Sequence, residues 1–125
     1  MRQFLVLAFA LLAASTLTMG GTGDDGRPGE RDRLVVFEAA DCAACLRLRA
    51  DVLRRPNGAI SDAHLGLEVI DLDALGTAGH PLRTAIRSLP TLVVMHKGRE
   101  VARLDGYLGR KQFLQFIHSS AGRGG

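Results

Sequence analysis

The sequence predicts one α/β domain in which four strands form a mixed sheet flanked by helices. The chain has 125 residues, the size of one ordinary domain. Its short apolar runs are rich in β-branched residues, as strands are, and they alternate with segments of helical periodicity. The expected order is strand, helix, strand, helix, strand, strand, helix. Strands joined through a helix lie parallel and strands joined by a tight turn lie antiparallel, so this order gives a mixed sheet.

The N-terminal part of the chain precedes the predicted domain. One positive charge at Arg2, an apolar stretch over 4–14 and small residues up to Gly20 are typical of a secretory signal peptide, which we expect at 1–20. An uncleaved leader that anchors the protein in a membrane is the alternative, although the apolar stretch is short for a span. Residues 21–33 are mainly Gly, Asp and Arg and are expected to form a flexible tether. Export predicts a periplasmic or secreted protein.

The domain, expected over 34–118, starts with a strand and a helix. The continuous apolar run 34–37 predicts a strand that is buried on both faces. Residues 42–54 have helical periodicity. Pro56 and the residues after it stop this helix. Three apolar positions are expected to share one stripe of the helix, namely Leu46, Ala50 and Leu53, with Leu48 and Val52 on a neighbouring face.

The middle of the domain predicts a strand and a short helix. Residues 67–72 alternate as a second strand does. A short helix is expected over 79–87, because Pro81 fits its first turn, where a missing N–H costs nothing. Pro90 cannot continue that helix.

The end of the domain predicts a hairpin and a final helix. Residues 91–95 and 100–104 are separated by a Lys-Gly turn and are expected to pair as antiparallel strands. The last helix is expected over 110–118, and a disordered tail over 119–125. Three side chains are expected on the buried side of that helix, Phe113, Phe116 and Ile117.

The chain has only two cysteines, Cys42 and Cys45, at the start of the helix predicted over 42–54. Residues three apart share one face of a helix, so the two sulfurs can meet. The N–H groups and the positive dipole at a helix N-terminus favour a thiolate, the reactive form, on Cys42. A structural disulfide closing so short a loop stabilises little, and a structural metal site normally has four ligands. The pattern therefore indicates thiol–disulfide exchange, with no cofactor beyond the Cys42–Cys45 disulfide itself.

Charge and composition argue against a nucleic-acid partner. Sixteen basic and thirteen acidic residues give a net charge of +3, and the basic groups are scattered along the chain. With one Tyr and no Trp, these groups are interpreted as solvated faces. His64, His80 and His118 are each isolated and are expected at the surface. We expect a monomer.

The element order, together with Cys-x-x-Cys after the first strand and Ser88-Leu89-Pro90-Thr91 before the third, resembles the thioredoxin fold. The similarity is most specific over 85–95 and the Lys-Gly-Arg-Glu-Val that follows. In thioredoxins the matching Pro is cis. A narrower likeness, to the SoxS-type periplasmic thioredoxins of sulfur-oxidation gene clusters, is carried by Phe37-Glu38 and by Gly106-Tyr107-Leu108-Gly109.

The resemblance implies roles for the site residues. Cys42 is expected to attack a client disulfide and Cys45 to resolve the mixed disulfide. The backbone of Leu89, next to Pro90, is expected to pair with a substrate segment, unless Pro90 merely starts a strand. Client proteins with disulfides and a membrane thiol reductase, as electron donor, are the expected partners. Asp41 beside Cys42 disfavours the thiolate, which favours a reductase over a disulfide oxidase or isomerase.

The chain also departs from the family pattern. Asp41 replaces the usual Trp, and Ala43-Ala44 replaces Gly-Pro between the cysteines. The buried Asp that thioredoxins carry six residues before the first Cys is Val36 here. Glu38, two residues on and on the same side of the strand, is a candidate proton relay, with a solvated strand end as its alternative.

A non-enzymatic alternative uses the same fold. Cys42, Cys45 and His80 together would form a soft copper site, as in copper-delivery relatives of thioredoxin. The cysteine spacing of those relatives is usually wider.

Overall fold

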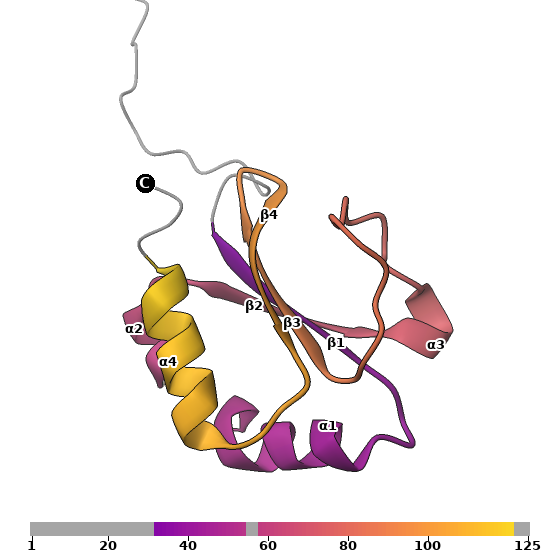
Figure 1. Cartoon of the computed structure of the whole chain (residues 1–125), viewed down its shortest axis with the longest axis horizontal. Helices are drawn as coiled ribbons and strands as arrows, with labels where there is room; N and C mark the ends of the chain where they lie inside the picture. Colours follow the sequence, from indigo (N-terminus) through magenta and orange to yellow (C-terminus); the bar gives the residue numbers. More distant parts are fainter. Residues whose placement is uncertain (1–31, 55–57, 122–125) are drawn as a thin grey trace, which may run out of the picture.

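The structure, a computed structural model, describes residues 32–54 and 58–121 (Figure 1). Its centre is one four-stranded sheet in the order β2-β1-β3-β4. β1 is parallel to β2 and antiparallel to β3, and β3 is antiparallel to β4, so the predicted mixed sheet is confirmed. The strands are β1 (Arg33–Glu38), β2 (Gly66–Asp71), β3 (Thr91–His96) and β4 (Arg99–Asp105).

The helix predicted over 42–54 is present, but it has two parts. α1 (Ala43–Leu48) continues directly into a π-helical segment, η1 (Arg49–Leu53). The stripe predicted through Leu46 is not the buried one, because Leu46 is 62% exposed. Cys45 and Leu48 are the residues of α1 that are buried, one helical turn apart.

Two short helices were not predicted, α2 (Ala59–Asp62) and α3 (Leu72–Leu75). Asp71 caps α3, since its carboxylate accepts from the backbone N–H groups of Asp73 and Ala74. The chain therefore turns into a helix at Leu72, where the sequence predicted the end of a strand. The last helix, α4 (Arg110–Ser120), is two residues longer than predicted and includes the start of the expected tail.

The helix predicted over 79–87 is wrong. Between α3 and β3 the chain has turns, bends and residues without regular structure, and no helix. Ala78 and Gly79 both have a positive φ, which is incompatible with a right-handed helix at those positions. Further on, the backbone N–H of Arg83 donates to the side chain of Glu100 at 2.7 Å and is not part of a helical ladder.

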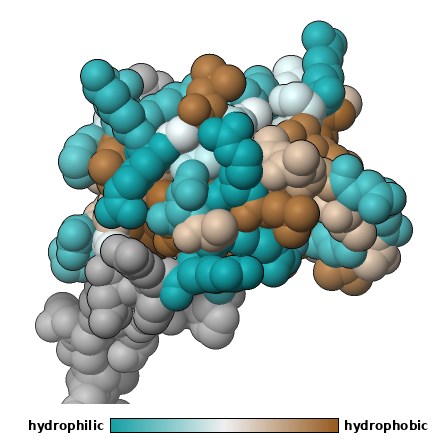
Figure 2. All heavy atoms as spheres, turned by 90° about the horizontal axis from the view of Figure 1, so that it is seen from below, coloured by the Kyte–Doolittle hydropathy of each residue, from teal (hydrophilic) through white to brown (hydrophobic). Residues whose placement is uncertain are grey.

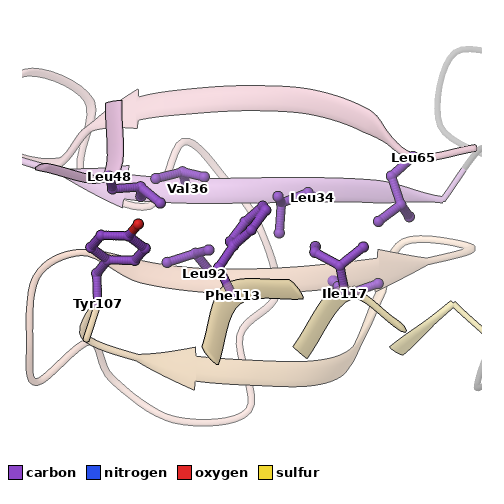
Figure 3. Packing of buried hydrophobic residues seen from close by; sticks show 9 residues of the cluster. Leu34, Val36, Leu48, Leu65, Leu92, Tyr107, Phe113 and Ile117 are labelled. Carbon is purple, nitrogen blue, oxygen red and sulfur yellow. The ribbon is translucent and has the colours of Figure 1, made fainter. Parts of the chain in front are cut away.

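The core lies on both faces of the sheet. On one face, nine buried residues pack between the sheet and the helices α1 and α4; Figure 3 shows their side chains pointing toward one another. Phe113 and Ile117 of α4 are fully buried in this cluster, and Phe116 packs against it, as expected. On the other face a smaller cluster around Phe37 and Val93 is covered by α3 and by the segment that leads to β3.

The signal peptide predicted at 1–20 and most of the tether predicted at 21–33 lie outside the described residues. Arg33, the last residue assigned to the tether, is the first residue of β1. Among residues 32–54 and 58–121, the structure has no helix that is both long and apolar enough to cross a membrane.

Candidate active site

The two cysteines lie where β1 passes into α1. β1 ends at Glu38, a short turn follows, and Cys42 is the N-cap of α1 with extended backbone angles. Cys42 and Cys45 form a disulfide with their Cα atoms 5.1 Å apart. The buried strand fixes one end of the turn and the helix fixes the other, so both sulfurs are held by regular elements.

The two sulfur positions are not equivalent. Cys45 is 2% exposed, whereas Cys42 is partly exposed. The Sγ of Cys42 accepts a hydrogen bond from the backbone N–H of Cys45 at 3.0 Å. The same N–H points at the sulfur that would carry the negative charge after reduction, as sequence analysis expected for a helix N-terminus. An incoming disulfide thus meets Cys42 first.

The strand register brings Pro90 to the end of the sheet at which β1 leads into the two cysteines. Phe37 of β1 is paired with Thr91 of β3, so Pro90, directly before β3, lies at the level where β1 ends. The Leu89–Pro90 peptide bond is cis, Pro90 is buried and Leu89 is partly exposed. The loop after β4 is bound at the same end of the sheet, because the backbone N–H of Gly106 donates to the carbonyl of Pro90 at 2.7 Å.

Glu38 is not a solvated strand end. Its side chain is 8% exposed, and Arg49 holds both carboxylate oxygens, with Nε donating to Oε2 at 2.8 Å and a second guanidinium nitrogen donating to Oε1. Arg49 is one helical turn beyond Cys45, so the ion pair lies beside that turn of the helix. Sequence reasoning named Glu38 but missed Arg49, whose spacing from Cys45 was the available signal.

Asp41 is exposed and directly precedes Cys42, and within the described part of the chain it forms no ion pair. Two apolar side chains are also exposed, Leu46 of α1 at 62% and Leu108 of the loop after β4 at 80%. Figure 2 shows the molecule from the side on which α1 lies in Figure 1; hydrophilic side chains cover most of this face, with apolar areas between them.

The structure does not bring His80 to the cysteines. Its Nε2 lies 3.1 Å from Oε2 of Glu68 on β2, and its ring packs edge-on against Phe37. Among the described residues no three His, Cys, Asp or Glu side chains are grouped to hold a metal. His80 is only partly exposed, unlike the surface position expected for it, while His64 and His118 are exposed.

Tyr107 anchors the loop after β4, a role that the sequence did not reveal. It is 3% exposed, and its hydroxyl donates to Oδ2 of Asp51 in η1 at 2.7 Å. Burial is the main cause that raises the pKa of Tyr107 to about 12, and the hydrogen bond to Asp51 adds to it. This bond ties the loop after β4 to the helix that carries the cysteines.

Fold and site together define a class of protein. A Cys-x-x-Cys disulfide at the N-terminus of a helix, with one sulfur partly exposed and one buried, at the end of a mixed sheet, defines a thiol–disulfide oxidoreductase. A family model described as a thioredoxin-like domain matches residues 26–121. The chain belongs to the thioredoxin-like domain family.

Solved structures share this fold at low sequence identity. The periplasmic thioredoxin SoxS from Paracoccus pantotrophus, in its reduced form, is 21% identical with a TM-score of 0.62, and the match covers 76% of this chain and 100% of that one. Thioredoxin from Fasciola hepatica is 20% identical, with a TM-score of 0.56 over 73% of this chain and 82% of that one. The thioredoxin NaTrxh from Nicotiana alata is 21% identical, with a TM-score of 0.57 over 73% and 74%. No curated protein matches the chain.

Proposed function

We propose that this oxidoreductase is exported and reduces disulfides of client proteins in the periplasm. The observation that carries the direction of electron flow is the exposed carboxylate of Asp41, directly beside Cys42 and free of an ion pair in the described part of the chain. A negative charge there disfavours the Cys42 thiolate. A dithiol whose thiolate is less stabilised gives up its electrons more readily, so the pair is a reductant. The periplasmic neighbour SoxS supports the compartment.

The exchange has two sulfur-transfer steps. The Cys42 thiolate attacks one sulfur of the client disulfide, a Cys42–client bond forms, and the other client sulfur leaves as a thiolate. The Cys45 thiolate then attacks Sγ of Cys42, which forms the Cys42–Cys45 disulfide and releases the second client thiolate. Two electrons pass from the cysteine pair to the client. Leu89 and Pro90, at the same end of the sheet, would bind the client segment. A membrane thiol reductase would then reduce the Cys42–Cys45 disulfide again.

Glu38 is proposed as the proton acceptor for Cys45. Cys45 is buried, so its proton needs an internal acceptor before the second step. The Glu38 carboxylate lies on the face of β1 that packs toward α1, on the same side as Val36, and is held by Arg49 one turn beyond Cys45. When Glu38 takes the proton, Arg49 loses its ion partner, but its side chain is 49% exposed and water can solvate the charge.

The equilibrium of the cysteine pair with glutathione tests the proposed direction. The reduced and oxidised forms would be separated after acid quenching across a series of glutathione ratios. A reduction potential near that of thioredoxins, about −270 mV, supports a reductase, whereas about −120 mV would make the protein an oxidant. Cys42→Ser should abolish insulin reduction, and activity in that variant would contradict the exchange mechanism itself.

A further inference from the structure

The segment that ends in Leu89 and Pro90 has no regular structure, yet side chains of β4 bind its backbone. It crosses the face of the sheet that lies opposite α1 and α4, from α3 to the start of β3 (Figure 1). Its backbone polar groups therefore need partners other than a helical ladder. At 83–85 these partners are Glu100 and Arg103 of β4.

Glu100 and Arg103 form a mostly buried ion pair. Their side chains are 2% and 15% exposed, and Nε of Arg103 donates to Oε1 of Glu100 at 2.5 Å. The other oxygen of Glu100 accepts the backbone N–H of Arg83 at 2.7 Å. Both carboxylate oxygens are thus used, one within β4 and one toward the segment.

The rest of the Arg103 guanidinium binds the same stretch of backbone. One terminal nitrogen donates to the hydroxyl of Thr84 at 2.8 Å and to the carbonyl of Ala85 at 3.2 Å, and the other donates to the carbonyl of Thr84 at 3.0 Å. Hydrogen bonds from an ionised donor are about twice as strong as neutral ones, and the planar fork fixes direction as well as distance. The ion pair therefore belongs to β4 and binds the backbone of residues 83–85.

From there to Pro90 the chain has little freedom. Ile86 packs against the core cluster around Phe37, and the hydroxyl of Thr91 donates to the carbonyl of Ser88 at 2.5 Å. The position of Leu89 is thus set from both sides, by the ion pair upstream and by β3 downstream.

We propose that Glu100 and Arg103 are positioning residues for the client-binding segment: they hold the backbone at 83–85 so that Leu89 and Pro90 are ready to pair with a polypeptide. This inference rests on the proposed function and deepens it. The ion pair then sets the affinity for polypeptide disulfides and leaves the rates of the two exchange steps unchanged. A small disulfide, which has no backbone to pair with Leu89, does not depend on it.

The test compares Arg103→Met and Arg103→Lys with Arg99→Met. Arg99 is an exposed residue of the same strand whose side chain makes no hydrogen bond to any described residue. Insulin and 2-hydroxyethyl disulfide serve as the polypeptide and the small substrate, with dithiothreitol as reductant, and urea unfolding checks the fold of each variant. Lysine keeps a charge for Glu100 but lacks the fork that reaches Thr84 and Ala85, so Arg103→Lys serves if the Met variant does not fold.

We expect Arg103→Met and Arg103→Lys to raise the KM for insulin about tenfold, the effect of losing roughly one charged hydrogen bond, with kcat within about twofold. Rates with 2-hydroxyethyl disulfide and all rates of Arg99→Met should match the wild type. An unchanged KM in a folded Arg103 variant, or an equal loss on both substrates, overturns the inference. Failure of the wild type to reduce either substrate would instead overturn the proposed function.

Discussion

At the scale of single residues, the difference in exposure between the two cysteines decides their roles. Cys42 caps the helix, is partly exposed and receives a backbone N–H on its sulfur. Cys45 is one turn inside and almost fully buried, and burial favours the neutral thiol. We expect the order of attack to follow from this asymmetry, with Cys42 first and Cys45 second.

The first prediction concerns this asymmetry. In the reduced protein at neutral pH, Cys42 should react with iodoacetamide at least about tenfold faster than Cys45, because only the accessible thiolate is alkylated. Peptide mass spectrometry after timed quenching measures both rates. Cys45→Ser should trap clients as stable mixed disulfides, and Cys42→Ser should trap none; the reverse pattern would exchange the two roles.

The second prediction concerns Glu38. Glu38→Gln keeps the size of the side chain and an oxygen for Arg49 but has no carboxylate to take the Cys45 proton. The second exchange step should slow by about tenfold or more, the lower range of general-base effects. The Cys42–client mixed disulfide should therefore accumulate, as seen on non-reducing gels after acid quenching.

Two controls sharpen this test. Glu68→Gln makes the same change in an ion pair of β2 and should leave the second step unchanged. The defect of Glu38→Gln should also shrink as the pH rises, because hydroxide then increasingly removes the Cys45 proton in place of the carboxylate. A mixed disulfide that disappears as fast in Glu38→Gln as in the wild type would remove Glu38 from the relay.

At the scale of elements, periodicity predicted the strands and the helix of the cysteines, because their apolar patterns reflect burial. It failed between α3 and β3. There the side chains of Arg103 and Glu100 form the hydrogen bonds of the backbone. Both residues are distant in sequence, so a local pattern cannot reveal them as partners. The π-helical turn of η1 was also out of reach, since nothing in residues 49–53 distinguishes a wide turn from an ordinary one.

The third prediction concerns the contact between η1 and the loop after β4. Tyr107→Phe removes the hydrogen bond to Asp51 and should lower the free energy of unfolding by about 1 kcal/mol near neutral pH. The pKa of Tyr107 is raised from 10.0 to about 12 in the folded protein. The neutral hydroxyl thus stabilises the fold fully below pH 10, and this stabilisation is lost as the pH rises toward 12.

Urea unfolding of the wild type and of Tyr107→Phe between pH 7 and 12 measures this effect. Taking the difference between their free energies of unfolding removes the contributions of all other titrating groups. The advantage of the wild type should be constant up to about pH 9.5 and then narrow. A difference that does not change with pH would contradict the burial of this hydroxyl.

At the scale of the whole molecule, the sequence predicted the elements that carry the candidate site better than the segments around them. Cys42, Cys45 and Pro90 stand in local motifs, and the pairing of β1 with β3 brings these motifs to the same end of the sheet. Arg49 and the Asp51–Tyr107 bond depend on the packing of α1 and η1 against the sheet and on the course of the loop after β4, which one sequence does not contain. The direction of electron flow depends on the balance of charges around the sulfurs, and of these charges the local motif shows only Asp41.

The last prediction concerns export. All four strands and both core clusters lie after residue 32, so removal of residues 1–20 takes away no part of the described fold. Expressed from its full sequence in a Gram-negative host, the protein should appear in the osmotic-shock fraction with a mass that lacks at least residues 1–14, because the charged start, apolar stretch and small residues direct cleavage after export. A double variant, Leu7→Arg with Leu11→Arg, interrupts the apolar stretch and should stay in the cytoplasm at full mass. Recovery of the wild type with Met1 intact in the membrane fraction would show that the leader is an anchor, and exchange would then take place at the membrane surface.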